Sequence, residues 1–527
     1  MALLPPKGTR IKLADHLGTV RFVGNVENTS GTWLGVEWDD ARRGKHDGIK
    51  DGKRYFTCRV QNAGSFIRPS ANISFGKSFL EAMTSRYIEA PHGSETPEKV
   101  ILGSSQGAIV VEAVRLDKIR GKLADLRQLR EVSLDNQEVA RCDAAGAVRE
   151  TCPGIRGLDL SASLLSSWDI VASIACELPA LDRLALNRNR LQPATDLVVM
   201  KTAFVHLTEL QLNGTMLTWQ EMQTATAAMP NLQLIEMGHN SLTQLQTGDK
   251  SQPPNKSVRV INLDSNACSD WVHLWKSLNH YTSLQRLLMT SNCIGAIPFP
   301  ENPQQELPSV KSISLSHNKI NAWSDVDALS SWCPGLETLT LNGNPLTSQT
   351  QARHSRPFTI SKIPTLLTLD GADISLRERA DSEILYLTQV LRASGSEEER
   401  VKGHPQWLNL CEKHGKPDDA EKRNNSQDKL SQRLIALNLY RSLSPTASDR
   451  GQVLASEPLV LRVLPTMTLR TLRMKAGKML KIKTTILFWL LQVDGTLVGL
   501  DVDRDQQGID WLGLDEGASI LFHVVQA

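Results

Sequence analysis

The chain has 527 residues, too many for one hydrophobic core, and this length predicts about three domains. Hydrophobic residues make up 40% of the sequence and charged residues 22%, as in an ordinary water-soluble protein. The formal net charge of +2 argues against a protein that binds nucleic acid over its whole surface. The longest apolar run, residues 486–493, is far shorter than the ~20 residues of a membrane span. The first residues also lack the apolar core of a secretory signal.

Eight cysteines are scattered along the chain, and no two of them form a Cys-x-x-Cys pair. A zinc site or a thioredoxin-type motif requires such tight spacing, so we expect neither a bound metal nor redox chemistry. Dispersed free thiols suit a reducing compartment, which predicts a cytoplasmic protein.

The first 76 residues carry twelve Lys and Arg against seven Asp and Glu. Short β-type runs bounded by glycine, "GTVRFVG", "TWLGVEW" and "RYFTCRV", predict a small β-barrel-like domain. The loop "GKHDG" at residues 44–48 lies between two of these runs. A basic, aromatic β-domain favours an acidic, extended peptide as its ligand.

The order of the blocks "GTVRFVG", "GTWLGVEWDD", "GKHDG", "GKRYFTC" and "GSFIRP" resembles the CAP-Gly domain. That resemblance implies a site for the acidic, aromatic-ended C-terminal tail of α-tubulin, or for similar Glu-Glu-Tyr/Phe tails. Lys45 would meet the carboxylates, aromatic rings would wall an apolar slot, and the two loop glycines would let backbone N–H groups approach the ligand. The tail-binding residues implied in this way are Trp33, Gly44, Lys45, His46, Asp47, Gly48, Phe56 and Phe66.

His46 departs from the family pattern, in which the loop usually reads GKNDG. An imidazole cannot reproduce the paired donor and acceptor of an amide, but it can donate a hydrogen bond to a carboxylate, and more strongly when protonated. The alternative interpretation is a solvated loop residue without a role in binding.

The middle of the chain repeats one pattern nine times, from "LREVSLDNQEV" (129–139) to "LETLTLNGNPL" (336–346). The copies are 26 residues apart, with a single step of 25, and this regularity predicts an α/β leucine-rich-repeat solenoid. Leucines at positions 1, 4 and 6 point inward, and the period of two makes each segment a short strand. The ninth position, most often Asn, is expected to bond to neighbouring backbone groups rather than to act in catalysis.

Positions 3, 5 and 7 of each repeat form the strand face, which is concave in such solenoids. The first six repeats place six acidic residues there against one Arg, and the last three place none. This distribution suits a folded protein surface and repels nucleic acid, although a merely solvated face is the alternative interpretation. The predicted client-binding residues are Glu131, Asp135, Asp159, Glu209, Glu236 and Asp264.

The remaining segments give predicted boundaries at 1–76, 77–392, 393–429 and 430–527. Residues 77–392 comprise the solenoid with an N-terminal lead-in, a closing cap at 363–374 and a shielding helix over 375–393. Residues 393–429 are charged and broken by Gly and Pro, which predicts a linker with some local order around Trp407. The last segment predicts a ββαββ order that resembles a ubiquitin-like domain of the β-grasp type, although it ends without a diglycine.

A CAP-Gly domain, leucine-rich repeats and a ubiquitin-like domain in this order resemble the tubulin-folding cofactor family. The resemblance implies a cytoplasmic, cytoskeleton-associated chaperone that acts with other cofactors on the αβ-tubulin heterodimer and binds neither nucleic acid nor membrane. "GKS" at 76–78 lacks the earlier glycine of a phosphate loop, because that position is Ala71, and no catalytic motif predicts an enzyme or a cofactor. The alternative is a microtubule-associated CAP-Gly adaptor, but such adaptors carry long coiled coils and no heptad run occurs here.

Overall fold

The computed structural model describes residues 4–70, 72–88, 100–102, 109–111, 126–246, 254–302, 307–348, 352–393, 395–416, 434–442, 457–481, 486–492 and 496–524. The chain divides into two compact units, Met1–Leu408 and Asn409–Ala527. Among the described residues, none of the helices combines the length and the apolar composition that crossing a bilayer requires.

The N-terminal domain is a five-stranded antiparallel sheet in the order β6-β3-β2-β1-β7, with β4 and β5 forming a separate hairpin. Alternating residues of β2 and β3, among them Val20, Leu34 and Val36, are fully buried in its core. The elements are β1 (Arg10–Leu13), β2 (His16–Asn25), β3 (Thr32–Trp38), the 3-10 turn η1 (Ala41–Arg43), β4 (Ile49–Lys50), β5 (Lys53–Arg54), β6 (Gly64–Ile67) and β7 (Ile73–Ser74).

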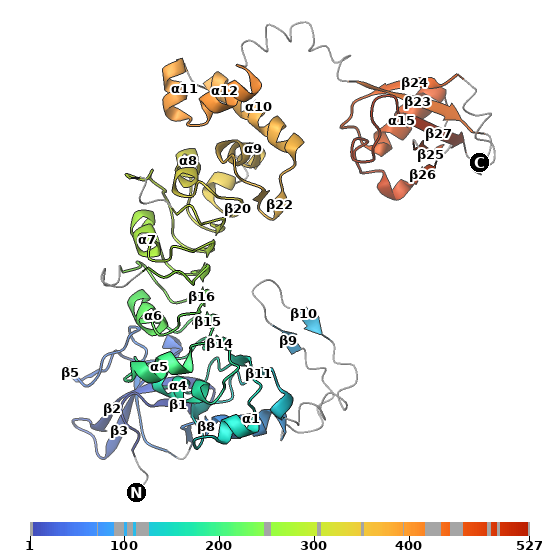
Figure 1. Ribbon diagram of the computed structural model, residues 1–527. Helices are drawn as coiled ribbons and strands as arrows, with labels where there is room; N and C mark the ends of the chain where they lie inside the picture. Colours follow the sequence, from blue (N-terminus) through green and yellow to red (C-terminus); the bar gives the residue numbers. More distant parts are fainter. Residues whose placement is uncertain are drawn as a thin grey trace. The chain divides into compact units, whose positions relative to one another are not determined.

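The solenoid is confirmed as one eleven-stranded sheet whose strands follow chain order (Figure 1). All neighbours are parallel except the last pair, in which β22 turns back along β21. Leu158, Leu184 and Leu210 occupy position 4 of successive repeats and lie opposite one another in the buried layer. The strands are β11 (Glu131–Ser133), β13 (Gly157–Asp159), β14 (Arg183–Ala185), β15 (Glu209–Gln211), β16 (Leu234–Glu236), β17 (Val260–Asn262), β18 (Arg286–Leu288), β19 (Ser312–Ser314), β20 (Thr338–Thr340), β21 (Thr368–Leu369) and β22 (Ala372–Asp373).

The asparagines of the repeat form the expected ladder between neighbouring repeats. The amide of Asn266 donates to the carbonyls of Met237 at 3.0 Å and Leu263 at 2.9 Å, and its Oδ1 accepts from the backbone of Asn240 at 3.0 Å. The residue before each ninth position has a left-handed backbone conformation in all nine repeats, with φ between 48° and 77°. Only Gly214 and Gly343 are glycines at this position, so seven repeats hold a side chain in a conformation that favours glycine.

Helices form the side of the solenoid opposite the strands (Figure 1). Four of them begin with a tryptophan, and Trp168, Trp219 and Trp271 are almost completely buried between repeats. Thr218 caps the helix that follows it, since its side chain accepts from the backbone of Glu221 and the Glu221 carboxylate accepts in return. The helices are α3 (Ala147–Thr151), α4 (Trp168–Cys176), α5 (Leu197–Ala203), α6 (Trp219–Thr226), α7 (Trp271–Leu278) and α8 (Trp323–Trp332), with the 3-10 turns η2 (Leu126–Gln128) and η4 (Pro345–Thr347).

The lead-in joins the N-terminal domain to the solenoid. Strand β8 (Lys77–Ser78) pairs in parallel with β12 (Val139–Arg141), and α1 (Phe79–Tyr87) packs on the first repeats. The lead-in also contains the hairpin of β9 (Val100–Leu102) and β10 (Ile109–Val111). The N-terminal domain and the solenoid therefore belong to one unit rather than to two separate ones.

The C-terminal end of the solenoid extends further than predicted. Helix α9 (Ala352–Lys362) packs against the expected shielding helix α10 (Leu376–Ala393). Two more helices, α11 (Glu397–Gly403) and α12 (Trp407–His414), occupy the start of the predicted linker. Trp407 is 1% exposed, and its burial accounts for the local order expected around it in this charged segment.

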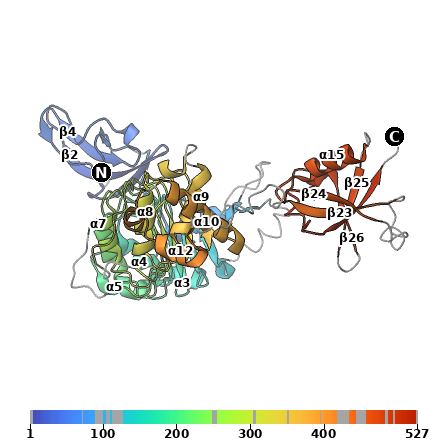
Figure 2. The ribbon, with the colours of Figure 1, turned by 90° about the horizontal axis from the view of Figure 1, so that it is seen from above.

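The second unit has the β-grasp arrangement, a helix packed on a mixed five-stranded sheet in the order β24-β23-β27-β25-β26 (Figure 2). Leu469, Leu472 and Ala476 bury one side of the helix against the sheet. The fifth strand, β26, was not predicted. The elements are β23 (Ile435–Arg441), β24 (Leu459–Val463), α15 (Leu469–Leu480), β25 (Ile486–Leu491), β26 (Leu497–Leu500), η7 (Val502–Arg504) and β27 (Ser519–Val524).

Candidate functional site

The GKHDG loop is fixed to the edge of the N-terminal sheet. The backbone N–H groups of Lys45 and His46 donate to the carbonyl of Gly64 at 2.7 and 3.2 Å, and Gly64 N–H donates back to His46 at 2.8 Å. The side chain of Lys45 is exposed, and among the described residues its ammonium has no hydrogen-bond or ion-pair partner. This loop thus presents a free cation from an ordered backbone.

Both loop glycines are required by contacts inside the domain. A Cβ on Gly44 would lie 2.0 Å from the carbonyl oxygen of Asn62, and one on Gly48 would lie 2.0 Å from that of Phe56. Gly48 also has a φ of +78°. The expected role of these glycines, close approach of the backbone to a ligand, stays a prediction, whereas the internal contacts alone account for their small size.

Asp47 points into the domain and braces the loop. One carboxylate oxygen accepts from Arg54 at 3.0 Å and the other from the backbone of Cys58 at 3.3 Å. The hydrogen bond from Arg54 lowers the pKa of Asp47, so this group is ionised throughout the neutral range. Its position suits support of the loop better than contact with an acidic peptide, which its negative charge would repel.

His46 lies between two aromatic rings, with centroid distances of 6.0 Å to Phe56 and 5.0 Å to Phe66. Its Nδ1 accepts a hydrogen bond from the backbone N–H of Gly48 at 3.0 Å. The ring does not reproduce the paired donor and acceptor of an amide, because its two nitrogens lie at separate positions of the ring. A neutral ring accepts at Nδ1 and keeps one N–H donor at Nε2.

The aromatic cluster is larger than predicted. Phe22 and Tyr55 join Phe56 and Phe66, with ring centroids 5.3 to 6.2 Å apart. Gly35 makes room for it, since a Cβ there would lie 2.4 Å from the Phe56 ring. Tyr55 directly precedes Phe56 in the run "KRYF", so the sequence offered a signal for it. Alternation along β2 does not show which of its residues faces the cluster, so Phe22 was missed.

Trp33 lies on the same face of β3 as Gly35, two residues along the strand. The ring contact that the structure gives it is with the Arg68 guanidinium, 3.8 Å from the ring centroid, and its Nε1 donates to Thr29 at 2.8 Å. Trp33 therefore flanks the cluster, whereas His46, Phe56 and Phe66 contact one another directly.

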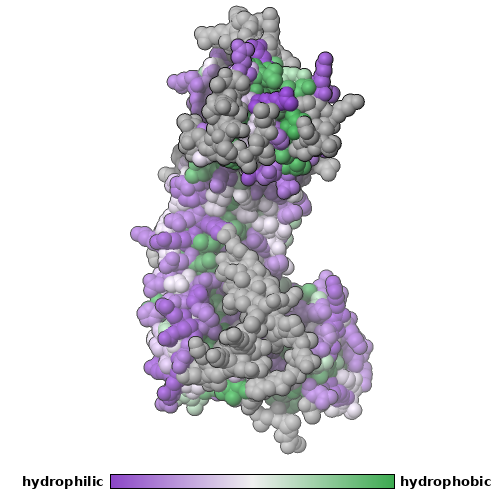
Figure 3. All heavy atoms as spheres, turned by 90° about the vertical axis from the view of Figure 1, so that its right-hand side faces the viewer, coloured by the Kyte–Doolittle hydropathy of each residue, from purple (hydrophilic) through white to green (hydrophobic). Residues whose placement is uncertain are grey.

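The strand face carries the six predicted acidic residues, and three of them are engaged by residues of other repeats. Glu131 forms an ion pair with Arg183, and the carboxylate of Glu236 accepts from Asn213 at 2.7 Å. Asp264 accepts from the backbone of Thr290 at 2.6 Å. Figure 3 views the molecule from this side, and where described residues of the solenoid are visible, hydrophilic side chains dominate with smaller hydrophobic areas between them.

Burial raises the pKa of Glu236 and Asp264, and repulsion from Glu209 adds to the effect on Glu236. Burial and the charge of Asp159 likewise raise the pKa of Asp135. Five of the six acidic residues thus fall into two interacting groups, Asp135 with Asp159, and Glu236 with Glu209 and Asp264. Glu131, compensated by Arg183, belongs to neither.

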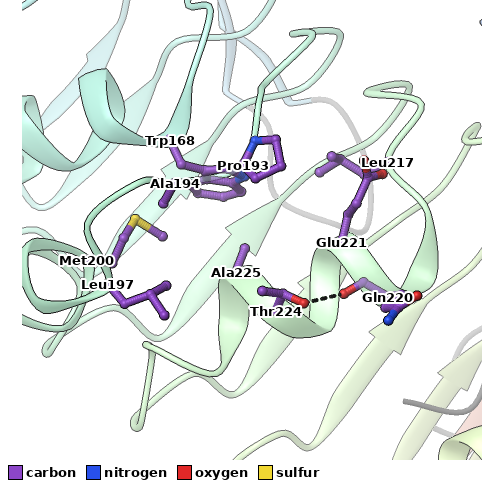
Figure 4. A pocket seen from close by; sticks show the side chains of 10 residues that line it. All are labelled: Trp168, Pro193, Ala194, Leu197, Met200, Leu217, Gln220, Glu221, Thr224 and Ala225. Atoms are coloured by element: carbon purple, nitrogen blue, oxygen red, sulfur yellow. Dashed lines mark hydrogen bonds between the residues drawn. The ribbon is translucent and has the colours of Figure 1, made fainter. Parts of the chain in front are cut away.

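A pocket of about 200 Å³ opens on the helical side of the solenoid, between α5 and α6 (Figure 4). Its lining is mostly apolar, and its one ionisable side chain, Glu221, already accepts from Thr218 and Arg59. The pocket therefore offers space for an apolar group and no pair of acid–base residues. It is lined by Trp168, Pro193, Ala194, Leu197, Met200, Leu217, Gln220, Glu221, Thr224 and Ala225.

Comparison with known proteins agrees with this architecture. A family model of the CAP-Gly domain matches residues 7–72. The chain is 33% identical over 451 residues to tubulin-specific chaperone E of Homo sapiens, which covers 82% of this chain and 84% of that protein. It is 30% identical over 542 residues to tubulin-specific chaperone E of Mus musculus, covering 98% of both.

The solution structure of the C-terminal ubiquitin-like domain of mouse tubulin-specific chaperone E is similar over 19% of this chain and 96% of that one, at 16% identity and a TM-score of 0.15. The domain order, the CAP-Gly match and the identity along most of the sequence lead to one conclusion. The chain belongs to the tubulin-specific chaperone E family.

Proposed function

We propose that the protein is a tubulin-folding chaperone that binds α-tubulin through its acidic C-terminal tail and its folded body. In this role it acts with other folding cofactors in assembling and dissociating the αβ-tubulin heterodimer. The observation that carries the proposal is the GKHDG loop, where Lys45 and His46 keep free donors beside an aromatic cluster. A cation and an N–H donor suit carboxylates, and the neighbouring rings suit an aromatic chain end.

The junction between the N-terminal domain and the solenoid supports a joint action on one client. Glu138 of the first repeat accepts from Lys12 at 2.8 Å and from Ser74 at 2.6 Å. Farther along the solenoid, Arg59 donates to Glu221 at 3.3 Å. Because these contacts hold the two parts in one unit, a client captured by its tail is presented to the same solenoid surface each time.

The strand face is proposed to contact the folded body of the client. Glu209 lies on β15, Glu236 lies on β16, and Asp264 follows the end of β17. Glu209 and Asp264 both repel Glu236, so a basic partner surface would relieve this repulsion. The proposed tail site is basic and the proposed body site is acidic. A partner with an acidic tail and a basic patch on its body therefore complements both.

The test is exchange of subunits between differently labelled tubulin dimers, measured with the full-length protein. We expect wild-type protein to accelerate exchange, and both Lys45→Ala and Glu209→Lys to reduce the acceleration. A microtubule adaptor would need the tail site alone and would leave exchange at its spontaneous rate. Binding of tubulin without any acceleration would therefore replace the chaperone with the adaptor.

A further inference from the structure

The tautomer of His46 is determined by its neighbour in the loop. Gly48 offers a backbone N–H, which can only donate, and it lies 3.0 Å from Nδ1. Nδ1 must therefore be unprotonated, and the neutral ring carries its proton on Nε2. The backbone of His46 is held by Gly64 on both sides, so the ring has little freedom to turn away from Gly48.

The other ring nitrogen is available to a ligand. Nε2 forms no hydrogen bond with any described residue, and it keeps contact with solvent. Phe56 and Phe66 contact the ring, which leaves Nε2 as its polar edge. An N–H donor in such a position matches a carboxylate, which can only accept hydrogen bonds when ionised and bonds more strongly to a positive donor.

The charges that face His46 come from its own loop and from the strand segments beside it. Burial, opposed by Asp47 and assisted by Lys45, lowers the pKa of His46 below its ordinary value. The carboxylate of Asp47 is already bonded to Arg54. Burial raises the pKa of Cys58 to about 12, so this thiol adds no charge near neutrality. Free His46 is therefore neutral at physiological pH, and a bound carboxylate would be the largest new influence on it.

We propose that His46 couples binding of a carboxylate at the GKHDG loop to the uptake of one proton. The proposal rests on the proposed tail site and adds a property that an asparagine at this position lacks. A proton from water adds to Nδ1, the hydrogen bond from Gly48 breaks, and the imidazolium keeps Nε2–H on the carboxylate. The peptide unit of Gly48 then turns its N–H away, because two donors cannot face each other at 3.0 Å.

The direction of the pH effect follows from linkage. The charge of the ligand favours the protonated ring in the complex. Loss of the Gly48 bond opposes protonation equally in the free protein and in the complex, so it does not change the difference between the two pKa values. Affinity should therefore rise as the pH falls from about 8 to about 6, and the gain approaches a limit of roughly tenfold for each unit by which the ligand raises the pKa of His46, a limit reached below the pKa of the free ring. The carboxylates of the ligand, with ordinary pKa values near ~4, stay ionised over that range.

The experiment is titration calorimetry of the full-length protein with a synthetic peptide that ends in Glu-Glu-Tyr. Heats measured at one pH in buffers of different ionisation enthalpy give the number of protons taken up per peptide bound. We expect a fractional uptake near pH ~6.5 in the wild-type protein, and none in His46→Asn, which keeps an acceptor for Gly48 and an N–H donor. His16→Asn removes the other histidine of the domain, whose ring packs on Trp38, and should leave the uptake unchanged.

Nitrogen NMR of the histidine ring gives an independent reading. The free protein should show the Nε2–H tautomer of His46, and peptide should raise its pKa, whereas a peptide ending in Gln-Gln-Tyr amide should not. Wild-type protein that binds the peptide without proton uptake, or His46→Asn that keeps the uptake, would overturn the inference while leaving the tail site intact. Failure of every variant to bind the peptide at any pH would instead remove the proposed tail site itself.

Discussion

The GKHDG loop leaves two donors free, whereas Glu236 and Asp264 of the strand face are bonded to residues of neighbouring repeats. Lys45 has no described partner, and the Nε2 of His46 keeps contact with solvent. On the strand face, Glu236 is 9% exposed and bonded to Asn213, and Asp264 is bonded to Thr290. Lys45 can bind a charged ligand without giving up an internal bond, and His46 gives up the bond from Gly48 only when its ring is protonated. Glu236 and Asp264 of the strand face must exchange an internal bond for one to the partner.

This difference assigns distinct parts to the two surfaces. Free, exposed donors speed association and add affinity directly. Buried carboxylates add little net affinity, because the partner's cation must be desolvated and the internal bonds of the carboxylates must be replaced. They discriminate strongly against a partner that lacks the matching cation, since the wrong partner leaves them unpaired. We therefore expect the loop to govern affinity for the tail, and the strand face to govern which folded protein is accepted.

The largest effect should come from Gly48→Ala. The new Cβ would lie 2.0 Å from the carbonyl oxygen of Phe56, and the φ of +78° disfavours any side chain. Because the loop must rearrange, we expect affinity for a Glu-Glu-Tyr peptide to fall by about 100-fold or more, measured by fluorescence anisotropy.

Gly52→Ala is the matched control. Its φ of +80° imposes the same backbone penalty, but a Cβ there meets nothing within 4 Å. Peptide affinity should stay within about threefold of wild type, at a cost in stability of ~1 kcal/mol. Similar losses of affinity in both variants would show that backbone strain alone, without the contact to Phe56, disables the loop.

Lys45→Ala should weaken the same peptide by roughly 10–100-fold, since a charged hydrogen bond contributes ~1.5–3 kcal/mol. Added salt should shrink the difference between this variant and the wild type. Lys53→Ala removes the same charge from the adjacent hairpin, where the ammonium pairs with Glu27, and should have a much smaller effect. Equal affinities of wild type and Lys45→Ala would remove the lysine from the site.

The combination Glu209→Lys with Glu236→Gln tests the strand face. Glutamine keeps the shape of Glu236 and its acceptor for Asn213, which avoids placing a lysine in a buried position. We expect the affinity for intact tubulin, measured by sedimentation, to fall by about tenfold, and the affinity for the peptide to stay unchanged. Glu131→Gln, at an acid already paired with Arg183, is the control and should leave tubulin binding within about twofold.

A folded double variant that binds tubulin normally would place the client contact elsewhere, for instance at the apolar pocket between α5 and α6.

The comparison also indicates what the sequence could predict. The repeat period located every strand of the solenoid from β11 to β20, and the asparagine ladder followed from the chemistry of one side chain. The CAP-Gly blocks located the loop. Local patterns of this kind depend on residues close together in the chain, so they can be read directly.

Features that depend on contacts between distant residues were not predictable. The junction of Lys12 with Glu138 joins residues 126 positions apart, and neither residue stands out from its neighbours. Local order around Trp407 was expected, but the two helices α11 and α12 at the start of the predicted linker were not. The role proposed for His46 depends on the backbone N–H of Gly48 pointing at Nδ1, and the spacing of residues in the sequence does not reveal that direction.

The junction gives a smaller prediction. Burial opposes ionisation of Glu138, but hydrogen bonds from Lys12 and Ser74 outweigh it and lower its pKa. Glu138→Gln should reduce the free energy of unfolding of this unit by about 1–2 kcal/mol near neutral pH, measured by urea titration. Because the folded pKa is below the unfolded one, the contribution of Glu138 is full above pH ~4.5 and is lost as the pH falls through the folded value.

A double variant with Lys12→Met should lose less than the sum of the two single losses if the ion pair is the cause. Additive losses would indicate that each side chain acts on stability separately.

The smallest effect concerns the left-handed position before each ladder residue. Ser291 is exposed at this position and has a φ of +58°. Ser291→Gly should raise the stability of the solenoid by roughly 0.5 kcal/mol, because the relief of backbone strain exceeds the added entropy of the unfolded chain. Gly214→Ser is the reverse change at the same position of another repeat, with φ at +65° and its nearest contact 3.4 Å away at Arg188. It should lower stability by a similar ~0.5–1 kcal/mol. Shifts of opposite sign in the urea midpoint would identify the backbone conformation as the cause, since the two sites share little else. Shifts of the same sign would mean that side-chain contacts, and not the left-handed turn, decide which residues this position of the repeat tolerates.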